Sequence, residues 1–122
     1  MTIRSKHLEG LFDGTEEIEL VPAPSSLVTL VISHISVHNI DTGALTPKIR
    51  RKDEAKEGDD DEYIHAFPEI SLAADETIET GKSLILSAGQ SIVGELDADP
   101  AANQPEWVVI WFEESYVPGI RG

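Results

Sequence analysis

Alternation of apolar and polar residues predicts β-strands along most of this chain. The strongest case is VTLVISHISVHN, from Val28 to Asn39, which is rich in β-branched residues and lies between two groups of turn-forming residues. Its β-branched side chains would restrict one another's χ1 angles in a helix, so we predict a strand. Further strands are predicted at Thr46–Lys52, Tyr63–Phe67, Ile70–Leu72, Glu76–Thr80, around Leu84 and Leu86, from Ile92 onward, and at Trp107–Glu113.

The spacing of these segments indicates the fold class. Turn-forming residues recur at intervals of about 8–12 residues, and no segment has a convincing helical pattern, as is typical of all-β domains. We predict a single antiparallel β-sandwich of jelly-roll-like form with about seven or eight short strands, spanning residues 21–114. Residues 1–20 are predicted to form an extended N-terminal arm, and residues 115–122 a C-terminal tail.

The predicted strand Thr46–Lys52 contains a proline and most of the basic residues. Pro47 cannot donate a ladder hydrogen bond, so the strand either begins at Pro47 or lies at a sheet edge. Five of the nine bases fall within nine residues, namely Lys48, Arg50, Arg51, Lys52 and Lys56. They form either a solvated strand and turn that balances the acids just after it, or a docking patch for an acidic partner.

The last predicted strand, WVVIWFE, is apolar on both faces. Trp107, Val109 and Trp111 point to one side, whereas Val108, Ile110 and Phe112 point to the other. We expect one face to pack in the sandwich core and the other to be covered by the N-terminal segment or by a neighbouring subunit. The predicted interface residues are Leu11, Phe12, Lys48, Arg50, Arg51, Trp107, Trp111 and Tyr116.

The histidine pair in SHISVHN raises the possibility of a metal site. On a helix, the four-residue spacing of His34 and His38 would allow both to bind one ion. On a strand the same spacing separates them by about 13 Å, too far to share an ion. We therefore predict surface or interface histidines and no metal site. One alternative is a metal held by symmetry-related histidines at a threefold axis.

Charge and composition exclude several classes of function. The 23 acids and 9 bases give a net charge of −14, which repels nucleic acids and anionic membranes. The longest apolar run is too short for a membrane span, and the N-terminus lacks a signal-peptide core, so we expect a soluble protein. The acidic run from Asp59 to Glu62 lacks the spacing of an EF-hand and is predicted to be a solvated loop, with Ca²⁺ binding as the alternative.

No catalytic motif is recognisable. Cysteine is absent, and the sequence contains no GxSxG, GxxxxGK[ST] or GxGxxG motif. Pairs of carboxylates are inevitable among so many acids and carry little information. We therefore predict that the protein is not an enzyme and needs no cofactor.

Four stretches carry a family resemblance over roughly residues 14–114: GTEEIELVPAP, VISHISVHNIDTG, ISLAADETIET and SLILSAGQSIVGEL, followed by a hydrophobic strand that ends in Glu113-Glu114. In this order they resemble the small β-sandwich virion proteins of tailed bacteriophages. Two features depart from that group: Gln90 stands where an aspartate is usual, and the acidic insert at residues 53–62 is longer.

The resemblance implies a non-enzymatic virion structural protein, in particular a capsid decoration (cement) protein that stabilises the head shell. Its expected partners are the major capsid protein or other virion proteins and further copies of itself, with a trimer favoured. The expected location is the virion, assembled in the host cytoplasm. The alternatives are a neck or tail component, or a carbohydrate-binding sandwich for host attachment that would use Trp107 and Trp111 as aromatic platforms.

Overall fold

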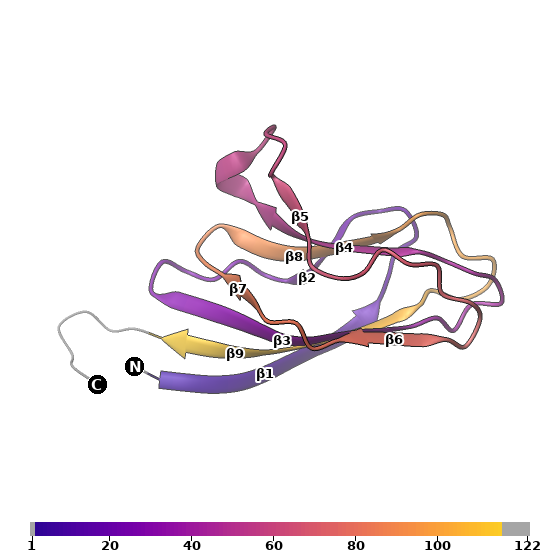
Figure 1. Cartoon of the computed structure of the whole chain (residues 1–122), viewed down its shortest axis with the longest axis horizontal. Coiled ribbons are helices and arrows are strands. Elements are labelled where there is room, and N and C mark those ends of the chain that lie inside the picture. Colours follow the sequence, from indigo (N-terminus) through magenta and orange to yellow (C-terminus); the bar gives the residue numbers. More distant parts are fainter. Residues whose placement is uncertain (1, 116–122) are drawn as a thin grey trace.

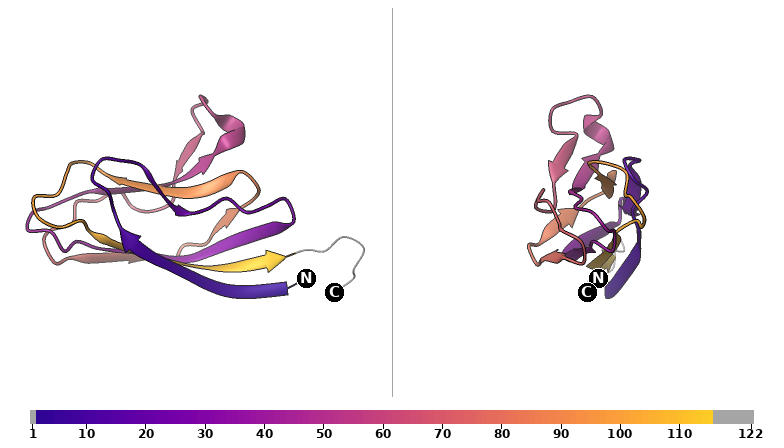
Figure 2. Two further views of the ribbon diagram at one scale, coloured as in Figure 1. Left: turned by 180° about the vertical axis from the view of Figure 1, so that it is seen from behind. Right: turned by 90° about the vertical axis from the view of Figure 1, so that its right-hand side faces the viewer.

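Two antiparallel sheets pack face to face in the computed structural model, which describes the backbone of residues 2–115 and the side chains of residues 5–115 (Figures 1 and 2). The first sheet comprises β1 (Thr2–Leu11), β9 (Glu106–Ser115), β3 (Val28–His38), β6 (Thr77–Thr80) and β7 (Leu84–Leu86). The second comprises β2 (Ile18–Val21), β8 (Gln90–Leu96), β4 (Pro47–Asp53) and β5 (Tyr63–His65). These nine strands confirm the predicted all-β antiparallel sandwich.

The strand order places β9 and β3 at the centre of the first sheet. The order is β1-β9-β3, and β6 and β7 then pair with successive parts of β3. The second sheet has the order β2-β8-β4-β5. A single 3-10 turn, Glu54–Lys56, follows β4 in the hairpin that projects from the sandwich (Figure 1). Within the described residues, no helix is long and apolar enough to cross a membrane.

Alternation along the strands builds the core between the sheets. On β3 the buried side chains are Leu30, Ile32, Ile35 and Val37, and an irregular pairing between Ile32 and His34 accounts for the break in their spacing. On β9 the buried side chains are Trp107, Val109 and Trp111. The second sheet contributes Leu20, Val21, Ile49, Ile92 and Leu96 from its inner face.

One strand prediction is confirmed and one is wrong. Of the two alternatives for Pro47, the first is confirmed, because Pro47 begins β4, and β4 lies between β8 and β5 rather than at a sheet edge. The proline causes no loss within the ladder because it occupies the first position. The segment Ile70–Leu72 is not a strand, since Leu72 makes only an isolated bridge with Leu45.

The predicted N-terminal arm is wrong, because most of residues 1–20 belong to the sandwich. β1 pairs with β9 over ten consecutive positions, from Thr2 opposite Ser115 to Leu11 opposite Glu106. Phe12 then turns into the core and is 2% exposed. This arrangement satisfies the hydrogen-bonding edge of β9, which β3 leaves open. Of the predicted C-terminal tail, Ser115 is the last residue of β9, and residues 116–122 lie outside the described part of the chain.

A buried asparagine closes the end of β3. The side-chain amide of Asn39 donates hydrogen bonds to the carbonyl oxygens of Gly43 (2.9 Å) and Leu72 (2.9 Å). It also reaches the carbonyl of Ala73 at 3.2 Å, while its Oδ1 accepts from the backbone N–H of Asp41 at 3.0 Å. Because Asn39 is fully buried, these bonds replace water for several backbone groups at once.

The Asp41 carboxylate joins this turn to the loop before β9. It accepts backbone hydrogen bonds from Asn103 (3.0 Å), Ala102 (2.8 Å) and Ala101 (3.0 Å). These bonds, that from Asn103 foremost, hold the pKa of Asp41 well below its ordinary range despite the opposing effect of burial. Asp41 therefore ties two loops that are far apart in sequence through one negative charge.

We expect Asp41→Asn to lower the melting temperature by several degrees at pH 7, because the amide offers one weaker acceptor where the carboxylate has two. A carboxylate whose pKa is lower in the folded than in the unfolded protein stabilises the fold at pH values above the ordinary carboxyl pKa. This stabilisation decreases as the pH falls below about 4. The difference between wild type and Asp41→Asn should thus narrow between pH 4 and pH 2 in thermal melts. Asp75→Asn, the same change in an exposed turn, is the matched control. A difference that does not change with pH would contradict this account.

Candidate interaction surface

An apolar row crosses the outer face of the first sheet. Phe112 of β9 lies opposite Val31 of β3, and Val31 lies opposite Ile85 of β7. These three residues, named here the apolar row, point away from the second sheet. Phe112 is 42% exposed and Ile85 is 56% exposed, and such a contiguous exposed apolar feature is typical of an interaction site.

The N-terminal segment does not cover this face. β1 extends the first sheet sideways, as the views from two sides agree (Figures 1 and 2), so the alternative in which it covers the outer side of β9 is wrong, and cover by a neighbouring subunit stays a prediction. Val108 and Ile110, on the same side of β9 as Phe112, are half-buried. Leu11 of β1 lies on this side too, and it is 55% exposed. The outer face of the first sheet is therefore open.

The histidines of SHISVHN lie on this same open face. His7 of β1 and His34 of β3 flank Ile110 of β9 in the register of the sheet. His34 Nε2 lies 3.3 Å from Glu79 Oε2, and His38 follows further along β3. In the part of the chain that the structure describes, no three histidine, aspartate or glutamate side chains come close enough together to hold a metal ion. The pair in SHISVHN is thus part of a sheet surface.

The outer surface of the second sheet has the opposite character, with many charged side chains. The predicted basic patch lies here, and most of its members contact acids. The ion pairs are Lys48–Glu69 (3.9 Å), Arg50–Glu95, Lys52–Glu17 (3.3 Å) and Lys56–Asp61 (2.6 Å). Arg51 alternates to the other side of β4, and its Nε is buried without a hydrogen-bond partner. Only Asp61 comes from the acidic run after β4, so the bases balance acids from several segments.

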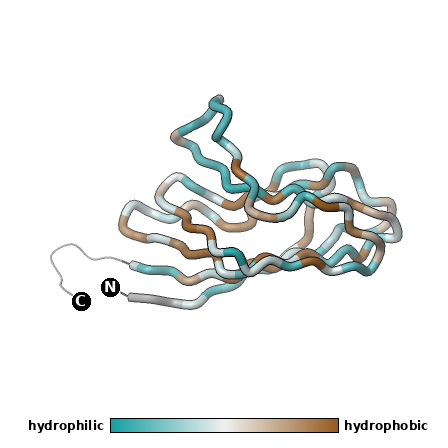
Figure 3. The backbone as a smooth tube through the Cα atoms, in the orientation of Figure 1, coloured by the Kyte–Doolittle hydropathy of each residue, from teal (hydrophilic) through white to brown (hydrophobic). Residues whose placement is uncertain are grey.

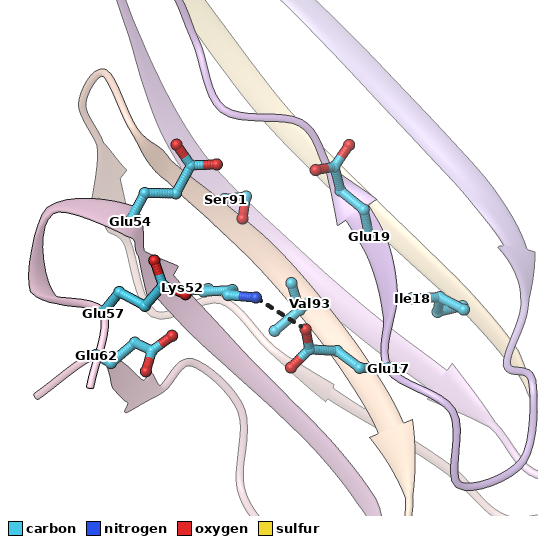
Figure 4. A pocket seen from close by; sticks show the side chains of 9 residues that line it. All are labelled: Glu17, Ile18, Glu19, Lys52, Glu54, Glu57, Glu62, Ser91 and Val93. Atoms are coloured by element: carbon cyan, nitrogen blue, oxygen red, sulfur yellow. Dashed lines mark hydrogen bonds and ion pairs between the residues drawn. The ribbon is translucent and has the colours of Figure 1, made fainter. Parts of the chain in front are cut away.

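A hollow with acidic walls lies beside this patch (Figure 4). Its lining residues are Glu17, Ile18, Glu19, Lys52, Glu54, Glu57, Glu62, Ser91 and Val93. The Lys52 ammonium group donates a hydrogen bond to Glu17, and this bond raises the pKa of Lys52. Figure 3 shows in teal the hydrophilic hairpin between β4 and β5, which supplies Glu54, Glu57 and Glu62 to the hollow. With five acids around one lysine, the hollow repels anionic ligands.

The aromatic residues predicted for an interface lie in the core. Trp107 and Trp111 are 6% and 5% exposed, and the indole N–H of each is buried without a hydrogen-bond partner. Phe12 is buried beside them in the same core cluster. A carbohydrate platform needs an exposed ring face, which neither tryptophan offers. Tyr116 lies outside the described residues.

The predicted interface residues do not form one surface. Leu11 lies on the edge strand of the first sheet, Lys48 and Arg50 lie on the second sheet, and Phe12, Trp107 and Trp111 are internal. The prediction missed Val31, Ile85 and Phe112. The alternation of β9 already separated Phe112 from the tryptophans, but both faces of this strand are apolar, so no signal in the sequence assigned one of them to the core.

Comparisons with known proteins show similarity of fold. No family model and no curated protein matches this chain. A solved structure from work on Bacillus endospore appendages, described as a family of disulfide-linked pili, matches with a TM-score of 0.55. The match covers 95% of this chain and 88% of the other, at 9% sequence identity. The chain therefore shares the all-β fold of a pilus protein.

Burial of both tryptophans predicts weak fluorescence quenching by acrylamide. We expect the slope of a Stern–Volmer plot to be several-fold lower for the native protein than for the same protein in concentrated urea. The chain has only two tryptophans, so the signal reports these two core positions. Equal slopes in the two states would show that the rings are accessible and would restore the aromatic-platform hypothesis.

Proposed function

We propose that this protein is a non-enzymatic structural subunit of a phage virion, and in particular a capsid decoration protein. The observation that carries the proposal is the apolar row Phe112–Val31–Ile85 on an otherwise open sheet face. Burial of such a row against a partner removes apolar surface from water, which is the main driving force of stable association. The sequence resemblance to phage virion proteins supports the choice of particle.

The contrast between the two sheets supports a definite orientation on the particle. The first sheet offers apolar residues and histidines, whereas the second is covered by ion pairs and acids. In the proposed assembly the first sheet faces the shell and neighbouring copies, and the second sheet faces solvent. With a net charge of −14, the exposed side would keep decorated particles apart in solution.

The fold comparison favours a second candidate, a subunit of a filament. The similar solved structure belongs to an appendage described as a disulfide-linked pilus, so this type of sandwich is used as a repeating subunit there. The present chain has no cysteine, so its copies would have to join without disulfides. A neck or tail component of the virion is the third placement, and it would use the same outer face.

The row is tested by the double variant Ile85→Lys/Phe112→Lys. Each side chain is about half exposed, so burial of the remainder contributes about 0.7–1.5 kcal/mol per residue, and binding to decoration-free capsids of the encoding phage should weaken at least about 10-fold. Ile70→Lys, a change at a comparably exposed isoleucine outside the sheets, is the matched control and should bind normally. Cosedimentation measures both. Unchanged binding by the double variant, or a wild-type protein that binds no capsid, would contradict the proposal.

Electron microscopy separates the three placements. Antibody against the protein should label the head shell of virions if the decoration proposal holds. Label on the neck or tail would instead favour a neck or tail component of the virion. Filaments formed by the purified protein, together with unlabelled virions, would favour the second candidate.

A further inference from the structure

The strand β1 is attached to the sandwich almost entirely through its backbone. Among the described strands it pairs with β9 alone. Its side chains from Ser5 to Glu9, and again at Leu11, are exposed. Gly10 is the half-buried exception, and a Cβ there would lie 2.9 Å from Trp107 Cζ2. Because β1 buries so few side chains, it is separable from the core in a way that no central strand is.

The chain just after β1 is fixed, which defines the segment that could move. Phe12 is buried and donates its N–H to the carbonyl of Pro105 at 3.0 Å. Gly14 donates its N–H to Gln104 Oε1 at 2.8 Å and has φ of 56°. This positive φ favours glycine, so the backbone of the turn is restricted at this position. β1 therefore projects from a rigid anchor and can pivot only before Phe12.

The edge of β9 that β1 occupies cannot remain empty. Without β1, β9 would present ten unpaired positions between two apolar faces, and such edges are prone to aggregate. A strand that pairs with this edge therefore protects the protein from aggregation. The ladder does not specify whether that strand comes from the same chain.

Charge favours a β1 strand as the occupant of this edge. β1 carries Arg4 and Lys6 against Glu9, whereas β9 carries three glutamates and no base. Lys6 Nζ lies 3.6 Å from Glu113 Oε2 across the pair. In a chain with a net charge of −14, β1 has more bases than acids, and it fits an acidic edge.

We propose that β1 is exchanged between copies, so that the β1 strand of one molecule pairs with β9 of the next. A ladder between two molecules has the same contacts as the ladder within one molecule. The ratio of exchanged to unexchanged molecules then depends on the local concentration of the protein. A strand of ten residues spans about 34 Å, enough to reach a neighbouring molecule. Main-chain hydrogen bonds also join acidic molecules whose charged surfaces repel one another. This exchange goes beyond the proposed function and does not depend on which particle the protein belongs to.

Cysteine pairs test the exchange, because the native chain has no cysteine to compete. His7 and Ile110 are register partners, so His7→Cys/Ile110→Cys places two thiols within disulfide reach across the β1–β9 ladder. Isotopically heavy and light pools of this full-length variant are unfolded together, refolded at high concentration and oxidised. Mass spectrometry then measures disulfide-linked peptides that join a heavy half to a light half.

Exchange predicts mixed heavy–light links in statistical proportion and covalent multimers on a non-reducing gel. The control pair Ser36→Cys/Val108→Cys spans β3 and β9, and it should give only links within one chain. Ser5→Cys/Phe112→Cys provides a second β1–β9 pair should the first variant fail to fold. Monomers whose links all lie within one chain, from either β1–β9 pair, would overturn the proposal. Binding to capsids is not part of the readout, so its failure leaves this result unaffected.

Discussion

The structure depends on one constraint: β9 is apolar on both faces and needs a strand at each edge. β3 fills one edge and carries four core side chains of its own, so this pair forms the centre of the molecule. β1 fills the other edge with little more than its backbone. The inner face of β9 supplies Trp107, Val109 and Trp111 to the core. Its outer face is left without cover, and the candidate interaction surface follows from that.

Polar contacts fix the loops around this apolar centre. Asn39 replaces water for several carbonyl groups at the end of β3, and Asp41 gathers three backbone N–H groups from the loop before β9. These two residues hold the ends of β3 and β9 in register at the same end of the sandwich. At the same end, the turn at Gly14 bonds to Gln104 of this loop and fixes the exit of β1. The positions of these strand ends therefore do not depend on which side chains the outer faces of the strands carry.

The sequence predicted strands well where alternation is a local property. Val28–Asn39 and Trp107–Glu113 were identified because apolar side chains recur at every second position, and the strand interpretation of SHISVHN is confirmed. β1 was missed because TIRSKHLEGL is largely polar and becomes a strand only by pairing with β9, a contact about a hundred residues away. Ile70–Leu72 failed for the opposite reason, since a local apolar run found no ladder partner. The candidate surface depends on which face of β9 lies inside, and alternation alone is symmetric in that choice.

The two faces of β9 also connect the proposed interaction surface with the proposed exchange of β1. A strand with one polar face would have buried its tryptophans and left a solvated exterior. Here Phe112 and its neighbours keep an apolar exterior directly above the pairing edge that β1 covers. Any partner that packs on the apolar row therefore lies beside the β1–β9 ladder. Packing of a partner on the outer face of β9 and pairing of a β1 strand with its edge would stabilise each other. The ion-paired second sheet can remain in solvent.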